Sequence, residues 1–151
     1  MLTLILSIFC FSADAANTTE ISADQSNVVT AVGKAENYVR KYGIEKAISK
    51  FKDAHDIFIG DYNGMFYVSP LHPELIGSSQ LNYKDSSGTF AVQEEIEKAK
   101  AGGGWLKGRL RKNPETGKDQ CRKIYVFPTV DNYYIGSWYY YSPNKAGTCS
   151  F

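Results

Sequence analysis

Apolar residues recur at intervals of three, four and seven positions through the first third of the chain. This spacing places them on one face of an α-helix of about 20 residues. Gly43 interrupts the pattern just after Arg40 and Lys41, whose charges complement the C-terminal end of a helix. A shorter helix resumes from Ile44 to Lys52. The apolar positions are Ile21, Val28, Val29, Val32, Ala35, Val39 and Tyr42 in the first helix, and Ile44, Ala47, Ile48 and Phe51 in the second.

Two short apolar runs follow the helices and predict a β-hairpin. They cover residues 57–60 and 65–68 and flank Asp61-Tyr62-Asn63-Gly64. Asn-Gly readily adopts the positive φ that a tight hairpin turn requires. The chain then leaves the sheet at Ser69-Pro70, because proline has no N–H to donate to a ladder. The irregular loop that begins there is where we expect a small-ligand pocket.

The second half of the chain predicts one short helix and three more strands. Residues 77–88 are rich in Ser, Asn, Asp and Lys and indicate a loop, after which a helix is expected from Phe90 to Lys100. Strands are expected over residues 105–111, 120–128 and 133–141, with turns between them. The predicted fold class is α+β. It combines a long N-terminal helix with a PAS-like five-stranded antiparallel sheet, and a loop and helix are inserted after strand two.

Length and composition indicate one globular domain. The chain has 151 residues, of which 43% are hydrophobic and 22% charged, which is sufficient for a single core. The formal net charge is only +1 and the basic residues are scattered among acids, so no nucleic-acid partner is expected. The 11 Tyr, 8 Phe and 2 Trp suit both a β-rich core and a pocket with hydrogen-bonding walls.

Residues 1–15 are interpreted as a signal peptide. The run MLTLILSIFCFS is shorter than the roughly 20 residues that span a bilayer, and Ala13-Asp14-Ala15 is a small-x-small cleavage pattern. The run carries no Lys or Arg, which leaves a buried N-terminal strand or a membrane anchor as alternatives. The cleavage pattern favours export. We therefore expect a periplasmic or secreted domain over residues 16–151.

The cysteines predict one disulfide. Cys10 falls in the apolar leader, where the bulky Phe9 before it does not fit a lipidation signal. Cys121 and Cys149 would then be the two cysteines of an exported chain, and in an oxidising compartment they most simply pair. The pair lacks the Cys-x-x-Cys spacing of redox-active sites, so a structural bond is expected. No histidine is near either cysteine in sequence, and no metal site is predicted.

Short motifs are arranged in order between residues 35 and 141. They are Tyr42-Gly43-Ile44-Glu45-Lys46-Ala47, Asp61-Tyr62-Asn63-Gly64, Pro73-Glu74-Leu75-Ile76-Gly77, Gly104-Trp105, Asn113-Pro114, Tyr125-Val126 and Ile135-Gly136-Ser137. No single motif is specific. Their order and spacing together resemble a single Cache domain of the second type (sCache_2), a PAS-like extracytoplasmic sensor domain.

The resemblance implies a pocket between the sheet and the loop–helix segment. Such pockets typically take a small organic acid, for example acetate, propionate, pyruvate or lactate. The resemblance also implies a role in sensing or signal transduction through a membrane-bound transducer, and no cofactor. Several residues differ from those usual in the family: Ser69 replaces a histidine, Arg122 a lysine and Trp138 a glycine. The bulk of Trp138 predicts a smaller or differently shaped cavity.

Two arginines are candidates for binding an anionic ligand. A guanidinium group matches a carboxylate in a two-pronged geometry, and Arg122 and Arg109 both lie in expected strands. A solvated strand face explains each of them equally well or better, given the alternation of Lys107, Arg109 and Arg111. Only the resemblance favours Arg122 as a ligand contact.

The remaining candidates are aromatic or lie in the loop after the hairpin. Tyr67 and Tyr125 could donate a phenolic hydrogen bond to a ligand, although packing in the core explains both. Trp105 follows three glycines and could close the pocket wall or pack against a helix. Ser69 and His72 lie in the loop, where a lone exposed histidine is more often inert.

The sequence supports a binding protein rather than an enzyme. It marks no Ser-His-Asp arrangement and no phosphate-binding loop after a strand. The first hypothesis is an exported domain that recognises a small organic acid and passes the signal to a partner. The alternative is a protein-interaction module with a vestigial pocket, in which the long helix packs against a partner. An exported enzyme is the weakest hypothesis.

Overall fold

The computed structural model describes residues 22–150, and the predicted signal peptide lies outside them. Helix α1 is followed by a shorter helix, a hairpin, an inserted loop with a helix, and the remaining strands. The elements are α1 (Ala23–Tyr42), α2 (Ile44–Phe51), β1 (Phe58–Asp61), β2 (Phe66–Val68), a 3-10 turn (Pro73–Leu75), α3 (Ala91–Lys100), β3 (Gly104–Trp105), β4 (Arg109–Lys112), β5 (Asp119–Pro128) and β6 (Tyr133–Tyr141).

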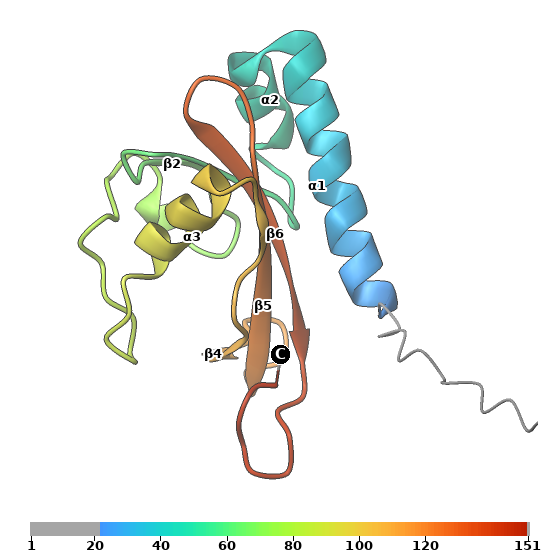
Figure 1. Ribbon diagram of the computed structural model, residues 1–151, viewed down its shortest axis with the longest axis vertical. Coiled ribbons are helices and arrows are strands. Elements are labelled where there is room, and N and C mark those ends of the chain that lie inside the picture. The colour runs from blue at the N-terminus through green and yellow to red at the C-terminus, as the bar shows by residue number, and fades with distance from the viewer. Residues whose placement is uncertain (1–21, 151) are drawn as a thin grey trace, which may run out of the picture.

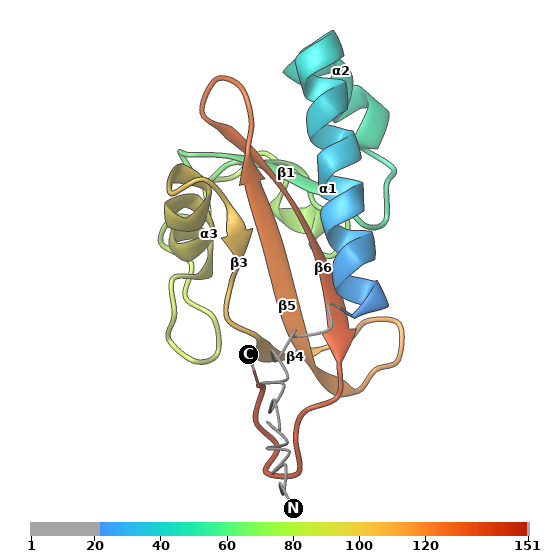
Figure 2. The same ribbon diagram turned by 45° about the vertical axis from the view of Figure 1, so that its right-hand side comes forward.

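One antiparallel sheet forms the centre of the molecule. Its strand order is β2-β1-β6-β5-β3, and β4 also pairs with β5. Helices α1 and α2 cover one face, whereas α3 and the loop before it lie on the other (Figures 1 and 2). This arrangement confirms the α+β fold class, the antiparallel sheet and the insertion after the second strand.

The long helix follows the predicted apolar stripe. Ser22 caps its start, with the side-chain oxygen accepting a hydrogen bond from the Gln25 amide at 3.2 Å. Gly43 ends it at a φ of 85°, a conformation that glycine adopts without a steric penalty. Val32 and Val39 are 1% exposed and pack against the sheet. The apolar face that an interaction module would present is therefore largely covered, although Val29 and Tyr42 remain exposed.

The strand predicted over residues 105–111 is wrong as a single element. It divides into β3 and β4, and the chain leaves the regular ladder between them. The space beside Gly108 is occupied: a Cβ built there would lie 2.1 Å from Tyr141 Oη and 3.5 Å from Cys149 Cβ. The Tyr141 side chain at the end of β6 therefore occupies the space that a side chain at position 108 would need, with Cys149 of the tail in contact beside it.

The predicted disulfide is confirmed. Cys121 on β5 is bonded to Cys149 in the tail, and the two Cα atoms are 5.6 Å apart. Tyr141 also holds the tail, because its hydroxyl donates a hydrogen bond to the Ser150 carbonyl oxygen at 2.7 Å. The bond thus holds the segment after β6 against the end of the sheet where β4 and β5 pair.

A second apolar cluster lies between the sheet and α3. It contains Phe58, Phe66, Val92, Ile96, Ala99, Leu106, Val126 and Tyr134. Gly136 on β6 makes room for the Phe58 ring, because a Cβ at this glycine would lie 2.1 Å from Phe58 Cζ. Phe58 in turn stacks on Trp138, with ring centroids 6.1 Å apart. The Phe58 ring can therefore occupy this position only because residue 136 is a glycine.

Gly136→Ala is expected to lower the free energy of unfolding by roughly 1–3 kcal/mol, because the added methyl group overpacks a filled core. Gly33→Ala is the matched control. Gly33 lies inside α1, and no atom lies within 4 Å of the position that an added methyl group would occupy, so alanine there should stabilise the protein by roughly 0.5–1 kcal/mol. Chemical denaturation of both variants checks the prediction, and an unchanged Gly136→Ala protein would contradict it.

Among residues 22–150, no helix is long and apolar enough to cross a membrane. The stripe on α1 is amphipathic and packs on the sheet, as its buried valines show.

Candidate ligand-binding site

A cavity opens between the sheet and the segment that connects β2 to α3. Its inner chamber has a volume of about 60 Å³ and is walled by apolar side chains, with Ser69, His72, Glu95 and Arg122 as the polar members. The chamber adjoins an outer cavity of about 470 Å³, which shares Phe66 and these four polar residues with it. The structure thus brings three of the predicted contacts, Ser69, His72 and Arg122, to one cavity.

The apolar walls come from four strands and the loop. Phe58 and Phe66 belong to the hairpin, Ile124 to β5 and Trp138 to β6, and Pro70 and Leu71 close the loop side. These side chains face the cavity because side chains alternate along a strand, which puts Arg122 and Ile124 on the same face of β5. An apolar chamber with a few polar groups is typical of small-ligand sites.

Arg122 provides the positive charge of the inner chamber. Its residue is only partly exposed, and the guanidinium forms no hydrogen bond or close ion pair with any residue in the described range. It does interact electrostatically with Glu95, across a longer distance. A guanidinium group carries five N–H donors, so this one has unused capacity for an acceptor in the cavity.

Glu95 is a buried carboxyl group that the sequence reasoning did not single out. It is 7% exposed and lines both parts of the cavity. Tyr134 donates a hydrogen bond from its hydroxyl to Glu95 Oε2 at 3.2 Å. Burial raises the pKa of Glu95 to about 7, and the opposing effects of Arg122, the Tyr134 hydrogen bond and Arg109 do not cancel it.

The rim of the cavity is polar and more exposed. His72 Nδ1 lies 3.1 Å from Glu74 Oε1, and the two side chains are 52% and 64% exposed. Ser69 is buried, and its carbonyl accepts a hydrogen bond from the His72 amide at 3.3 Å. Ser69 therefore fixes the start of the loop, while His72 lies at the mouth of the cavity.

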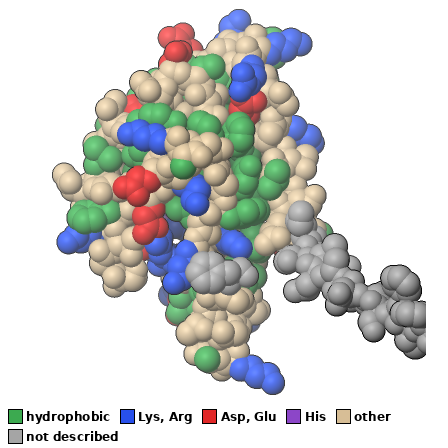
Figure 3. All heavy atoms as spheres, viewed as in Figure 1, with side chains coloured by type: hydrophobic (Ala, Val, Ile, Leu, Met, Phe, Trp, Pro, Cys, Tyr) green, Lys and Arg blue, Asp and Glu red, His purple; other side chains and the backbone are tan. Residues whose placement is uncertain are grey.

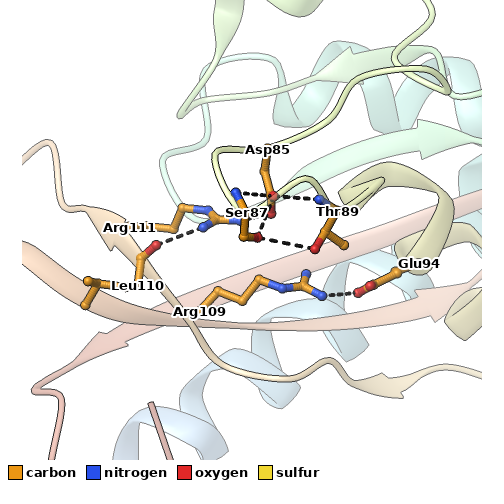
Figure 4. Close-up of polar contacts among 7 residues, drawn as sticks. All are labelled: Asp85, Ser87, Thr89, Glu94, Arg109, Leu110 and Arg111. Carbon is orange, nitrogen blue, oxygen red and sulfur yellow. Dashed lines mark hydrogen bonds and ion pairs between the residues drawn. The ribbon is translucent and has the colours of Figure 1, made fainter. Parts of the chain in front are cut away.

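The outer cavity is bounded by a loop that one aspartate organises. Asp85 Oδ1 accepts hydrogen bonds from the amides of Ser87 and Thr89, each at 2.9 Å, and its other oxygen pairs with Arg111 (Figure 4). Burial of Asp85 raises its pKa, but the hydrogen bond from the Ser87 hydroxyl, the two amide hydrogen bonds and Arg111 outweigh that effect and lower the pKa to about 2. The loop is thus fastened to β4 by a charged link.

Arg109 lies next to the cavity but is already paired. Its guanidinium forms an ion pair with Glu94 on α3, as Figure 4 shows. It is the cross-strand neighbour of Arg122 and lines a small adjoining hollow with Arg122 and Glu95. Arg109 therefore joins β4 to α3 and contributes positive charge near the site without facing the inner chamber.

The three aromatic candidates do not line the cavity. Tyr125 packs in the core beneath α1, and Trp105 makes an edge-to-face contact with it at 5.1 Å between ring centroids. Tyr67 donates a hydrogen bond to Asp61 Oδ2 at 3.0 Å and packs against Tyr133. Packing, the alternative that the sequence left open, accounts for these side chains, and the structure gives them no common site with Arg122.

The helix pattern contained a signal for Glu95. The positions Val92, Glu95, Ile96 and Ala99 follow the spacing of three and four that marks the buried face of a helix. An acid on such a face needs a partner or a raised pKa. The sequence could therefore have nominated Glu95, although it could not show that Tyr134 and Arg122 lie beside it.

Two further observations limit the chemistry of the site. Within residues 22–150, no group of three or more His, Cys, Asp or Glu side chains is placed to hold a metal ion. On the face drawn in Figure 3, basic and acidic side chains lie intermixed rather than gathered in a patch of one sign. The face drawn there thus shows no broad patch of one charge.

An antiparallel sheet with a long helix on one face and a cavity under a loop–helix insertion on the other defines the class of PAS-like sensor domains. The model of the family Single Cache domain 2 matches residues 16–142, and the chain belongs to this family. This confirms the resemblance found in the sequence. A comparison with curated proteins gives no match.

Solved structures of chemotaxis proteins share the fold. The crystal structure of a methyl-accepting chemotaxis protein from Vibrio parahaemolyticus RIMD 2210633 has a TM-score of 0.64 and 15% identity, covering 77% of this chain and 87% of that chain. A periplasmic sensor domain of a chemotaxis protein has a TM-score of 0.63 and 19% identity, covering 77% and 94%. A Cache chemosensory domain, described for carboxylic acid recognition, has a TM-score of 0.61 and 18% identity, covering 78% and 93%. These identities establish a common fold alone.

Proposed function

We propose that the cavity binds a small organic acid and that the domain acts in extracytoplasmic sensing. The observation that carries this proposal is the guanidinium of Arg122, which faces the cavity without a hydrogen-bonding partner among the described residues. Carboxylates are the preferred small partners of a guanidinium, because both are planar and can form two parallel hydrogen bonds. The Cache neighbour described for carboxylic acid recognition supports the same ligand class.

The size and lining of the inner chamber favour a short ligand. A cavity of about 150 Å³ accommodates benzene. The inner chamber, at about 60 Å³, suits a smaller group, such as the methyl or ethyl part of acetate or propionate beside Phe58 and Trp138. Larger ligands would extend past Ser69 into the outer cavity.

Binding would serve a signalling role through a partner. We propose that the domain comprises residues 16–151, that residues 1–15 direct export, and that a membrane-bound transducer reads the bound state. The Cys121–Cys149 disulfide supports an oxidising compartment, periplasmic or extracellular. Membership of a sensor family, together with a site that holds no arrangement of catalytic groups recognised in the described residues, supports a binding protein rather than an enzyme.

A ligand screen on the purified protein tests this function. Acetate, propionate, pyruvate and lactate are added separately at pH 6, and the melting temperature and the calorimetric Kd are measured. A ligand present at about 100 times its Kd should raise the melting temperature by roughly 5–10 °C. If none of the four stabilises the protein or binds in calorimetry, the proposed function is wrong.

Arg122→Gln is expected to weaken the affinity for the best of these ligands by about tenfold or more, because a charge-assisted hydrogen-bond pair is lost. The matched control is Arg40→Gln, since Arg40 is an exposed arginine on α1 that pairs with Glu36, away from the cavity. Calorimetric titration of both variants checks the prediction. Equal affinities for the two variants would remove Arg122 from the site.

A further inference from the structure

We propose that Glu95 is the proton-accepting residue of the inner chamber, and that the chamber takes up one proton on Glu95 with each short monocarboxylate that binds beside Arg122. The inference rests on the proposed function, because it concerns the same cavity and the same ligand class. It assigns to Glu95 a role that is separate from the contact between Arg122 and the ligand.

The geometry places Glu95 where it must respond to an anion. Glu95 and Arg122 line the inner chamber, the outer cavity and the adjoining hollow. Tyr134 occupies Oε2 of Glu95 through its hydroxyl. Burial raises the pKa of Tyr134 well above its usual range, so this hydroxyl remains a donor. The other carboxyl oxygen of Glu95 is thus the one available to carry a proton and to donate it in a hydrogen bond to the ligand.

The charges in the chamber explain why a proton accompanies the ligand. With Glu95 ionised, its negative charge offsets the positive charge of Arg122. A carboxylate that enters then leaves one excess negative charge in a largely apolar, partly desolvated chamber, which is unfavourable. Protonation of Glu95 removes that excess. It also converts Glu95 from a group that repels the ligand carboxylate into one that can donate to it.

The other groups around Glu95 do not provide the same response. Arg109 on β4 and Glu94 on α3 are paired with each other, and they shift the pKa of Glu95 in opposite directions. His72 is the one histidine that lines the cavity, and it lies at the exposed rim beside Glu74. In the outer cavity, Asp85 is paired with Arg111. Glu95 is therefore the buried acid of the chamber, and its pKa of about 7 lets it exchange a proton near neutral pH.

Calorimetry on the purified wild-type protein tests the inference, with the best of acetate, propionate, pyruvate and lactate as the probe. All four are fully ionised above pH 6, so the ligand itself contributes no proton change. We expect the Kd to rise about tenfold between pH 6 and pH 8, because the free protein must first be protonated at the higher pH. Titrations at pH 8 in phosphate and in Tris, which have different ionisation enthalpies, should show uptake of close to one proton per ligand.

Three variants identify the group that takes up the proton. Glu95→Gln keeps an oxygen that can accept from Tyr134 but cannot ionise, so its Kd should be nearly the same at pH 6 and pH 8. Glu94→Gln is the matched control on the same helix, and His72→Gln tests the rim histidine. Both should keep most of the tenfold change. If Glu95→Gln does not fold, the two-buffer measurement on the wild-type protein still tests whether a proton is taken up, and His72→Gln and Glu94→Gln still test whether either of those two groups receives it.

The possible results separate the two proposals. Binding with no proton uptake at pH 8 would overturn the role of Glu95 and leave the carboxylate site intact. A pH dependence that disappears in His72→Gln and persists in Glu95→Gln would also overturn it. Failure of all four acids to bind at pH 6 would overturn the proposed function, and the role of Glu95 with it.

Discussion

Removing the disulfide with Cys121→Ala and Cys149→Ala together is expected to lower the free energy of unfolding by roughly 3–4 kcal/mol. The bond closes a loop with a sequence separation of 28 residues, and in the chain-entropy model a loop of this length restricts the unfolded chain by about that amount. Cys121 is fully buried, so the loss of packing there adds to the effect. Urea denaturation of the variant and the wild-type protein measures the difference.

Reduction of the wild-type protein provides the control for this experiment. A reducing agent should lower the stability of the wild-type protein by a similar amount and leave the double variant unchanged. The tail that follows β6 should also become more accessible to proteases. Once the covalent link is lost, the hydrogen bond from Tyr141 to Ser150 still holds the tail, and it is much weaker than a disulfide. A loss of less than about 1 kcal/mol would mean that the tail packs as well without the bond.

The order of helices and strands could be predicted because it depends on local patterns. The valines of α1 repeat at helical spacing, and Gly43 ends that helix where the pattern breaks. The division between β3 and β4 could not be predicted in this way. Between the two strands, Gly108 lies against Tyr141 and Cys149, and these residues are distant in sequence. Contacts of that kind depend on the tertiary fold.

The candidate site could be predicted only in part, because it too depends on contacts between residues that are distant in sequence. The loop after the hairpin was expected to form a pocket, and it brings Ser69 and His72 to the cavity that Arg122 lines. The Tyr125 hydroxyl could also donate a hydrogen bond to a ligand, yet the alternation of side chains along β5 turns Tyr125 toward α1 and away from the cavity. Residue type alone could not distinguish the two faces of a strand that is covered on both sides.

Glu95→Gln is expected to stabilise the ligand-free protein at pH 8 by about 3 kcal/mol and to have little effect at pH 4. The usual pKa of a glutamate is 4.5, whereas burial raises the pKa of Glu95 in the folded protein to about 7. Between these values the folded protein holds a proton that the unfolded chain has released. Wild-type stability therefore falls as the pH rises from about 4.5 to about 7, and the difference in pKa corresponds to about 3 kcal/mol.

Chemical denaturation of wild-type protein and variant at half-unit steps from pH 4 to pH 8 measures this difference directly. The variant cannot ionise at this position, so its stability should lack this decline, while every other titrating group is common to both proteins and cancels. Glu94→Gln, which removes the partly exposed neighbour that pairs with Arg109, should follow the wild-type curve to within about 1 kcal/mol. A stability difference for Glu95→Gln that stays constant with pH would show that Glu95 ionises normally in the fold.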